Sequence, residues 1–369
     1  MSMKIELRSS VSRSVRFIAP VRDFQMKKKA KFNVAVVGVG AVGEEMLRVL
    51  RQRDFPVDQL RVFARSARDI QVDGQTYAVT PITPEGFAGI DIALFAGTEG
   101  EKGAAVTFAP EAVKRGAVVI DNGADFRMDP KVPLVVPEVN AKDVKKHKGI
   151  IANPNCSTIQ MVVALWPIYK KAGIKRIIVT TLQASSGAGR GAVEQLKEET
   201  SKIASGGCEN VQADVENKAM PQQLAYNVFP HIGSFTECDY TNEEWKLVKE
   251  THKIMHDDKI KISATTVRVP VRTGHSESIY IETAKTIEPQ KIKALLSRAP
   301  GVILMDDPQA SLYPMPKDAE GKDQTFVGRI RKDPFIKTGL WLWVVADNLR
   351  KGAATNAVQI AEELIKYQK

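Results

Sequence analysis

Apolar residues in the first part of the chain form short continuous runs that alternate with segments of helical periodicity. A run at residues 33–37 leads through a glycine-rich turn into residues 44–50, whose apolar positions repeat with helical spacing. Further runs at 60–64, 90–95 and 117–122 are largely apolar and alternate with predicted helices. The pattern predicts an α/β fold with a Rossmann-type, doubly wound parallel sheet.

The first turn has the spacing G-x-G-x-x-G and lies between a strand and a helix. Glycines at such a turn allow a pyrophosphate to approach the backbone and the helix N-terminus. We therefore predict a dinucleotide site, and an ordinary glycine-rich turn is the alternative. The predicted loop comprises Gly38, Val39, Gly40, Ala41, Val42 and Gly43.

The end of the strand at 60–64 indicates which dinucleotide binds. NAD-binding folds usually carry an acidic residue at this position for the ribose hydroxyls. Here Arg65 and Ser66 follow the strand, and a cation with a hydroxyl suits a 2′-phosphate. We predict NADP rather than NAD, and we interpret nearby Arg68 as a solvated surface residue.

A cysteine lies at the predicted start of a later helix. Apolar residues at 159–166 have the spacing of a buried helix face, and Asn155 is a favourable N-cap. Cys156 thus falls in the first turn, where the helix dipole favours a thiolate by at most ~2 kcal/mol. That lowers the pKa of a thiol from about 8.5 to about neutrality, so a nucleophile would need a second helper, such as a histidine. A buried structural cysteine is the equally weighted alternative.

The second half of the chain predicts an α+β domain. A strand at 175–182 ends at Gln183, a residue placed to hydrogen-bond a ligand, or an ordinary loop residue. A second glycine loop then leads into a helical segment at 192–197, and polar residues 201–220 predict a surface excursion. Asp121-Asn-Gly-Ala-Asp-Phe-Arg127 leaves a strand of the first sheet at its carboxyl end, where such sheets bind ligands.

A capping box from Thr241 to Glu244 predicts a helix over 241–255. On this helix Glu243 and Lys246 are i, i+3 neighbours, a spacing that by itself indicates a solvated ion pair. The segment 347–365 predicts a long amphipathic helix that packs back on the nucleotide domain.

Strands at 262–271 and 276–282 flank the most promising histidine. Arg268 lies on the first of them, and His275 follows a glycine at the junction before the second. Of the five histidines, His275 is the best placed for acid/base chemistry, although a lone histidine is more often structural.

Composition narrows the class of protein. A chain of 369 residues with 43% hydrophobic and 26% charged residues is globular and long enough for two domains, and it has no apolar run of about 18 residues that suggests a membrane span. The net charge is +10, of which residues 1–31 carry +7. The remainder has no basic stripe interleaved with aromatic residues, so we expect neither nucleic acid nor membrane as partner.

Residues 1–31 lack the apolar core of a secretory signal. Arg and Ser give them a faint likeness to an organelle transit peptide, but Glu6 and Asp23 count against it. We interpret them as an extension, expected to be disordered, before a true start at Met26. Three scattered cysteines are too few for a disulfide framework or a zinc site. We therefore expect a cytoplasmic protein without a metal, with organellar import as the lesser alternative.

Six motifs share their order and spacing with one enzyme family. They are Asn153-Pro-Asn-Cys-Ser-Thr158, Gln183 with Ser185-Ser-Gly-Ala-Gly189, Glu243-Glu-Trp-Lys246, Arg268-Val-Pro-Val271, Gly274-His275 and Asp347-Asn-Leu-Arg-Lys-Gly-Ala-Ala354. Together they strongly resemble aspartate-β-semialdehyde dehydrogenase, over a likeness that runs from about Phe32 to the C-terminus.

The resemblance implies a glyceraldehyde-3-phosphate dehydrogenase-like architecture with domains at 32–154, completed by 346–369, and at 155–345. It implies NADPH-dependent reduction of L-4-aspartyl phosphate to L-aspartate 4-semialdehyde, in biosynthesis of lysine, threonine, methionine and isoleucine, by a homodimer or dimer of dimers. By this resemblance Cys156 forms the thioester, His275 performs the acid/base chemistry, and Gln183 and Asn155 orient the acyl group. Arg268 binds the substrate carboxylate, Glu243 binds its ammonium, and Arg127 and Lys246 bind phosphate. The implied NADP contacts are the glycine loop and Arg65, Ser66, Ser186, Gly187 and Asn348.

Three motifs depart from the family. The usual G-A-T-G-x-V-G loop is one residue shorter here and lacks its threonine, D-N-S-S becomes Asp121-Asn-Gly-Ala124, and S-A-G-G becomes Ala96-Gly-Thr-Glu-Gly100. These departures affect the expected cofactor contacts. The nearest rival family, N-acetyl-γ-glutamyl-phosphate reductase, resembles P-G-C-Y around its cysteine, and its substrate has no ammonium for Glu243. A non-catalytic NADP-binding or thiol-sensing protein is the alternative from another class.

Overall fold

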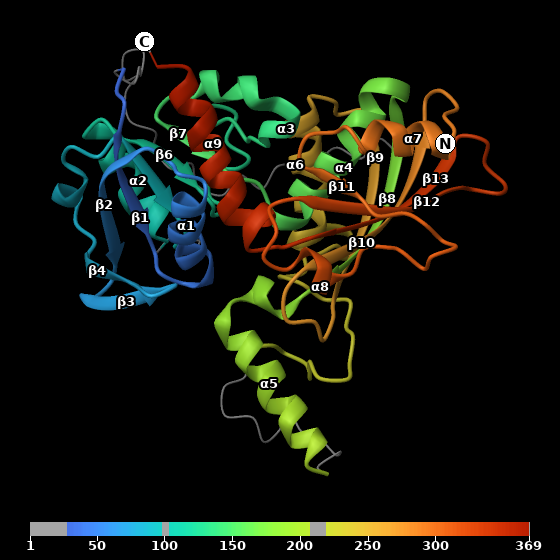
Figure 1. Cartoon of the computed structure of the whole chain (residues 1–369), viewed down its shortest axis with the longest axis horizontal. Helices are drawn as coiled ribbons and strands as arrows, with labels where there is room; N and C mark the ends of the chain where they lie inside the picture. Colours follow the sequence, from blue (N-terminus) through green and yellow to red (C-terminus); the bar gives the residue numbers. More distant parts are fainter. Residues whose placement is uncertain (1–27, 98–102, 207–218, 369) are drawn as a thin grey trace.

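The protein contains two β-sheets that lie side by side, with helix α9 (Thr355–Lys366) between them (Figure 1). Helix α5 (Arg190–Ala204) extends away from the two sheets (Figure 1). The computed structural model describes residues 28–97, 103–206 and 219–368. Of the basic extension, residues 1–27 lie outside this description. Within it, the Lys29 ammonium pairs with the Asp91 carboxylate at 2.6 Å.

The first sheet has seven strands in the order β3-β4-β2-β1-β5-β6-β7. Every neighbouring pair is parallel except β3 with β4, which confirms the predicted parallel sheet apart from one edge. The continuous runs in β5 and β6 are buried at every residue, as expected for strands covered on both faces. The strands are β1 (Phe32–Val37), β2 (Val57–Ala64), β3 (Arg68–Val72), β4 (Gln75–Pro81), β5 (Ile92–Phe95), β6 (Val118–Asp121) and β7 (Ile150–Ala152).

The antiparallel β3–β4 hairpin was not predicted. It turns at Asp73-Gly74, where both residues have positive φ, 49° and 78°. An Asp-Gly pair between alternating apolar residues is a strong hairpin signal, so the sequence did contain it.

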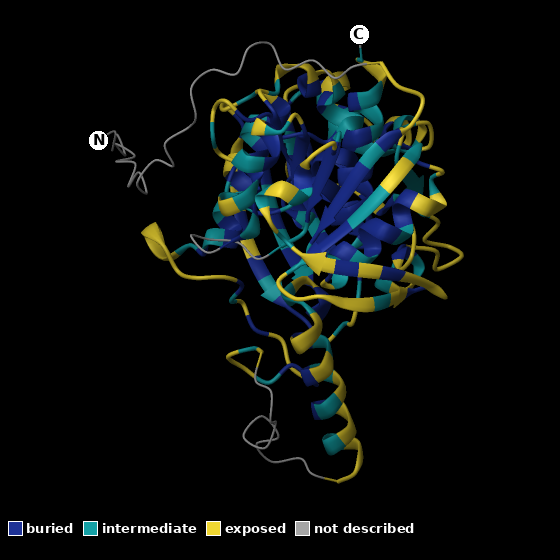
Figure 2. Cartoon of the chain, turned by 90° about the vertical axis from the view of Figure 1, so that its left-hand side faces the viewer, coloured by how far each residue is buried: buried dark blue, intermediate teal, exposed yellow. Residues whose placement is uncertain are grey.

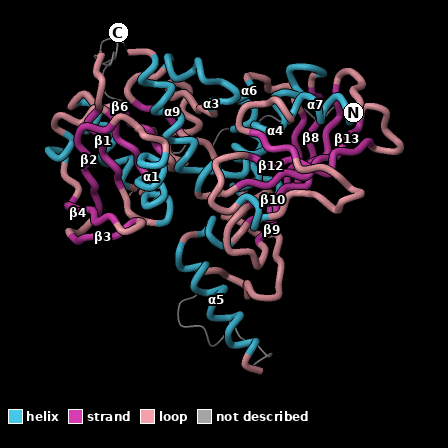
Figure 3. Tube along the Cα trace, viewed as in Figure 1, coloured by secondary structure: helices cyan, strands magenta, loops and turns pink. Residues whose placement is uncertain are grey.

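Helices cover both faces of this sheet (Figure 3). They are α1 (Ala41–Gln52), α2 (Ala104–Lys114) and α9, with 3-10 turns η1 (Pro84–Phe87) and η2 (Ala141–Lys146). A short helix, α3 (Pro137–Asn140), packs against α9. Apolar residues of α9, among them Val358 and Leu364, join the core formed by β1 and α1. The C-terminal helix therefore packs on the first sheet, as its sequence predicted.

The predicted helix over 347–365 is wrong at its beginning. Asp347 Oδ1 accepts hydrogen bonds from the backbone N–H groups of Leu349 and Arg350, and the chain then makes a π-helical turn, η6 (Arg350–Ala354), before α9. The π-helical bonds from Gly352 N to Asp347 O and from Ala354 N to Leu349 O span five residues. Such a turn has no signature in apolar periodicity.

The second sheet has six strands in the order β11-β12-β13-β10-β8-β9. One face packs on α4 (Cys156–Ala172), α6 (Asn242–Met255) and α7 (Pro289–Leu296), through buried aliphatic residues such as Ile159, Leu247 and Ile279. The strands are β8 (Ile174–Gln183), β9 (Lys261–Arg268), β10 (His275–Thr283), β11 (Val302–Leu304), β12 (Thr325–Lys332) and β13 (Gly339–Ala346). The short elements are η3 (Ser185–Ala188), η5 (Glu237–Asp239) and α8 (Pro316–Ala319).

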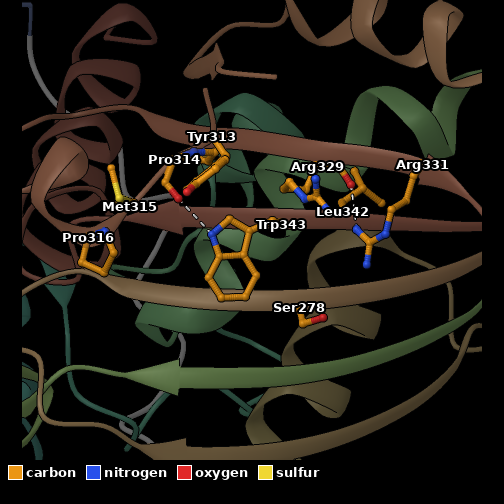
Figure 4. Close-up of a pocket in the computed structure, with 9 residues that line it drawn as sticks. All are labelled: Ser278, Tyr313, Pro314, Met315, Pro316, Arg329, Arg331, Leu342 and Trp343. Carbon is orange, nitrogen blue, oxygen red and sulfur yellow. Dashed lines mark hydrogen bonds between the residues drawn. The ribbon is translucent and has the colours of Figure 1, made fainter. Parts of the chain in front are cut away.

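On the other face of the second sheet, α8 packs on β13 over Phe326 and Val345, and beside it lies a cavity of about 420 Å³. Figure 4 shows Trp343 at its centre, with the indole Nε1 donating to Pro314 O at 2.9 Å. Ser278, Met315 and Arg331 line the same cavity. This face of the chain therefore combines an apolar floor with cationic edges.

Helix α5 stands away from both sheets and is largely exposed along its length (Figure 2). It runs to Ala204, longer than the predicted segment 192–197, and residues 207–218 of the predicted excursion lie outside the description. Buried Glu199 holds the returning chain, because its Oε2 accepts from the N–H groups of Leu224 and Ala225 at 2.7 and 2.8 Å.

Candidate active site

Cys156 is the first residue of α4, which begins directly after β7 at the carboxyl edge of the first sheet. Asn155 caps the helix, since its Oδ1 accepts from Ser157 N at 3.0 Å and Thr158 N at 3.3 Å. The predicted N-cap is confirmed. Cys156 as a residue is half-buried, and its thiol is free of any disulfide.

The environment of Cys156 opposes ionisation of the ligand-free thiol. Burial raises its pKa to about 12, and the Glu243 carboxylate adds to this, whereas Arg127 and Lys246 act to lower it. The expectation of a pKa near neutrality is therefore wrong, because it counted the helix dipole and omitted desolvation. The resting nucleophile is a thiol.

A cavity of about 510 Å³ opens at Cys156 between the two sheets. It brings together residues that are far apart in the sequence and come from β8, α4, α6, β9 and the loops after β6 and β13. The sequence-predicted residues that line it are Val42, Arg127, Asn155, Cys156, Gln183, Ser186, Gly187, Glu243, Lys246, Arg268 and Asn348. The others, Gly38, Val39, Gly40, Ala41, Gly43, Arg65, Ser66 and His275, do not line it.

Glu243 contacts three other side chains in one wall of this cavity. It is 6% exposed, and its Oε1 accepts from Asn155 Nδ2 at 2.8 Å and Gln183 Nε2 at 3.3 Å. Its Oε2 pairs with Lys246 Nζ at 3.1 Å. Because α6 packs on α4 here, the ion pair faces the cavity, and the solvated pair indicated by spacing alone is wrong.

Burial of Glu243 favours its protonated form, but Lys246, Asn155 and Gln183 outweigh this and lower the pKa of the carboxyl. The wall therefore presents a fixed negative charge. Gln183, which also donates to Ser157 Oγ at 3.0 Å, is fixed by these bonds at the end of β8.

Arg268 and His275 both hydrogen-bond to the backbone of Ala184. Arg268 Nη1 donates to Ala184 O at 2.6 Å, and His275 Nδ1 accepts from Ala184 N at 3.1 Å. Within the described part of the chain, Arg268 Nε has no hydrogen-bond partner although it is buried. Arg268 thus brings a buried positive charge to the cavity with donor capacity to spare.

The histidine is completely buried behind the cavity wall. Because Nδ1 accepts a hydrogen bond, the neutral ring carries its proton on Nε2. Burial and the Arg268 charge lower the pKa of His275 to about 3, so the ring is neutral. A Cβ on Gly187 would lie 2.9 Å from Cε1 and 3.0 Å from Nε2, so only glycine fits against the ring at this position.

Two residues that support the site, Gly352 and Glu250, were not predicted from the sequence. Gly352 packs against the nucleophile, because a Cβ there would lie 2.8 Å from the Cys156 Cβ. Glu250, buried on α6, pairs with Arg127 at 3.1 Å between Oε1 and Nη1. No local signal marks either contact, since the partners are brought together only by the fold.

The glycine loop has the geometry that a dinucleotide requires. Gly38 has φ +94°, and a Cβ on Gly43 would lie 1.8 Å from Gly38 O. A Cβ on Gly40, the N-cap of α1, would have no atom within 4 Å, which leaves open space at the helix N-terminus. Such a terminus suits a pyrophosphate. Val39 is buried behind it, and Ala41 lines a smaller cavity of about 170 Å³ with Ser186.

Two further groups belong to the predicted cofactor region. Arg65 and Ser66 are exposed directly after β2, and Arg68, predicted to be merely solvated, donates from Nη1 to Ser66 Oγ at 3.2 Å. Asn348 joins the second glycine loop to the histidine strand, because it donates to Ser186 Oγ at 2.9 Å and accepts from Gly274 N at 2.9 Å.

Comparisons with known proteins agree along the whole described fold. The model of the semialdehyde dehydrogenase NAD binding domain matches residues 33–147, and that of the semialdehyde dehydrogenase dimerisation domain matches residues 165–351. The aspartate-semialdehyde dehydrogenase of Aquifex aeolicus is 56% identical over 91% of this chain and 98% of its own. The chain belongs to the aspartate-semialdehyde dehydrogenase family.

Solved structures of this family share the architecture. Aspartate semialdehyde dehydrogenase II of Vibrio cholerae, complexed with ASA, has a TM-score of 0.85 and 44% identity and covers 92% of this chain and 99% of its own. The Candida albicans enzyme, solved with NADP, has a TM-score of 0.68 and 25% identity and covers 91% and 98%. The chain is accordingly an oxidoreductase with an NAD(P)-binding and a dimerisation domain, whose relatives are named aspartate-semialdehyde dehydrogenase.

The family departures fall around the cofactor region. In Asp121-Asn-Gly-Ala124, Asp121 Oδ1 accepts from Gly123 N at 3.0 Å and shapes the turn that carries Asn122 into the cavity. Residues 98–100 of the third departing motif, Ala96-Gly-Thr-Glu-Gly100, lie outside the description. Within the described ranges there is no cluster of three metal-ligating side chains and no helix with the length and apolarity to cross a bilayer.

Proposed function

We propose that the chain reduces L-4-aspartyl phosphate to L-aspartate 4-semialdehyde with NADPH, through a thioester on Cys156, on the way to lysine, threonine, methionine and isoleucine. One observation carries the proposal. A single cavity presents a thiol, a buried arginine, a fixed carboxylate and two further cations. Those are the complements of a substrate that bears a carboxylate, an ammonium and a phosphate.

Each substrate group has a matching partner. Arg268, with a buried Nε that no described residue occupies, binds the substrate carboxylate. Glu243, kept ionised by Lys246 and two amides, binds the ammonium. Arg127 and Lys246 bind the phosphate, and Asn155 and Gln183 fix the acyl group against the start of α4.

In the acyl-transfer step, Cys156 Sγ bonds to the acyl carbon and the bond from that carbon to the phosphate oxygen breaks. The thiol proton ends on the departing phosphate, which Arg127 and Lys246 stabilise. NADPH, when bound, supplies the hydride. As the C–S bond then breaks, the Nε2–H of His275 donates a hydrogen bond to the departing sulfur, and a proton from solvent restores the thiol.

We propose NADP as the cofactor, in preference to NAD. Support comes from Arg65, Ser66 and Arg68, which gather two guanidinium groups and a hydroxyl at the end of β2. The related Candida albicans structure contains NADP. Gly38 to Gly43, with Ser186, Gly187 and Asn348, form the remaining proposed contacts.

We further propose domains at 32–154 with 346–369 and at 155–345, and a homodimer or dimer of dimers that pairs through the face around Trp343. The cavity on that face and the match to a dimerisation domain support this surface. Trp343→Glu should shift the mass measured by light scattering toward the monomer, and an unchanged mass would exclude this face.

A free Cys156 thiol also requires a reducing compartment, and on that ground we propose the cytoplasm.

The assay for the activity runs in the phosphorylating direction. Purified protein should reduce NADP with aspartate semialdehyde and phosphate, and Cys156→Ala should abolish the reaction. N-acetylglutamate semialdehyde, the substrate type of the rival family, should react far more slowly because it offers Glu243 no ammonium. Faster turnover of the acetylated substrate would transfer the assignment to that family.

A further inference from the structure

One face of α6 carries four charged residues, at positions 243, 246, 250 and 253. Their spacing of three and four residues places them along one side of the helix. Glu243 and Lys246 line the cavity, whereas Glu250 and Lys253 do not. The second pair lies deeper, against the loop that follows β6.

Glu250 is 1% exposed, and each of its oxygens holds a different segment. Oε1 pairs with Arg127 Nη1 at 3.1 Å. Oε2 accepts from the backbone N–H of Asn155 at 2.7 Å, one residue before the nucleophile. Burial raises the pKa of this carboxyl, and the Arg127 charge with the Asn155 hydrogen bond opposes the rise. One carboxylate therefore sets the distance between Arg127 and the Cys156 turn.

Lys253 fixes the backbone of the same arginine. Its Nζ donates to the carbonyl oxygens of Arg127 at 2.6 Å, Asp129 at 2.7 Å and Val132 at 2.8 Å. An ammonium has three donors, so these bonds use all of them. Arg127 is thus held at its head by Glu250 and at its backbone by Lys253.

We propose that Glu250 is a positioning residue that sets Arg127 for the phosphate group and aligns the Cys156 turn with it, with Lys253 holding the loop. The inference rests on the proposed function. Glu250 touches no substrate group in this assignment, so its effect on the KM for phosphate passes through Arg127.

Two effects of Glu250 on phosphate oppose each other. Its negative charge near Arg127 repels an anion, whereas its bond orients the guanidinium. A displacement of about 1 Å in a positioned group costs roughly a hundred-fold in rate, and loss of the carboxylate removes a charged partner from the buried guanidinium. We infer that orientation dominates, and this sign is measurable.

The test compares Glu250→Gln with wild type in the phosphorylating assay. We expect kcat/KM for phosphate to fall about ten- to a hundred-fold while the KM for aspartate semialdehyde stays within about twofold. In an Arg127→Ala background the same substitution should change the KM for phosphate little, because this part of its effect passes through Arg127. A phosphate KM that is unchanged or lower in Glu250→Gln overturns the inference.

The matched control is Glu244→Gln. Glu244 is also a buried acid on α6, but it accepts from the backbone N–H groups of Thr241 and Thr266 and makes the capping box. This variant should unfold at a lower temperature and keep the ratio of the two KM values. A changed ratio in Glu244→Gln would mean that any buried charge on α6 has this effect, which also contradicts the inference.

Lys253→Met provides a second route if Glu250→Gln does not fold. It retains the aliphatic part of the side chain and removes the three carbonyl bonds, so the same selective loss toward phosphate is expected. An unaltered phosphate KM in Lys253→Met would contradict the role of Lys253 in holding the Arg127 loop. If wild type itself fails to turn over aspartate semialdehyde, the proposed function fails rather than the positioning role.

Discussion

Gly352→Ala perturbs the nucleophile without removing any reacting group. The added Cβ would lie 2.8 Å from the Cys156 Cβ and 3.3 Å from its Cα. Ordinary contacts between carbon atoms begin at about 3.5 Å, so Cys156 or the π-helical turn must move by roughly 0.7 Å or more. Overpacking of this kind costs about 1–3 kcal/mol of stability, and a shift of about 1 Å in a reacting group costs roughly a hundred-fold in rate.

The assay is kcat for phosphate-dependent reduction of NADP, measured beside urea unfolding. The control is Ala354→Gly, which removes a fully buried methyl from the same turn and does not press on Cys156. Both variants should lose stability, and only Gly352→Ala should lose about ten- to a hundred-fold in kcat. A Gly352→Ala enzyme within twofold of wild type would refute the contact as a determinant of the nucleophile's position.

Three further outcomes follow from the geometry. Glu243→Gln should raise the KM for aspartate semialdehyde at least about ten-fold, because an ammonium loses a charged partner; an unchanged KM would remove Glu243 from the ammonium site. Arg65→Ala should lower kcat/KM for NADP and leave that for NAD within about twofold, and equal losses would contradict a 2′-phosphate contact. Burial lowers the pKa of His147 from 6.5 to about 4, so between these two pH values the unfolded chain binds more protons than the folded chain, and the free energy of unfolding should decrease as pH falls. Urea titrations should show a smaller decrease for His147→Asn than for wild type. Parallel curves for the two proteins would exclude His147 as a contributor.

The sequence identified features whose partners are close along the chain. The cap at Asn155 and the capping box from Thr241 to Glu244 depend on neighbours within three residues, and both have the predicted bonds. Runs such as 117–122 predicted parallel strands because burial on both faces requires continuous apolar residues. The first sheet was therefore predictable, apart from its edge hairpin.

Contacts across the fold were not predictable in this way. Glu250 and Arg127 are separated by 123 positions, and neither has a local motif that indicates the other. The π-helical turn that brings Gly352 to Cys156 depends on Asp347 capping the chain before the helix begins. Desolvation of the thiol likewise depends on the packing of α6 against α4, so the sequence overstated how readily Cys156 ionises.

The central claim is that Cys156 carries the acyl group. Enzyme mixed with aspartate semialdehyde and NADP, without phosphate, should release a burst of about one NADPH per active site, because hydride transfer then precedes a slow release of the acyl group. Intact-protein mass spectrometry of the quenched sample should show one aspartyl group, mapped to the peptide that contains Cys156 and released when phosphate is added. A burst without an adduct, or an adduct on Cys238, would contradict the account.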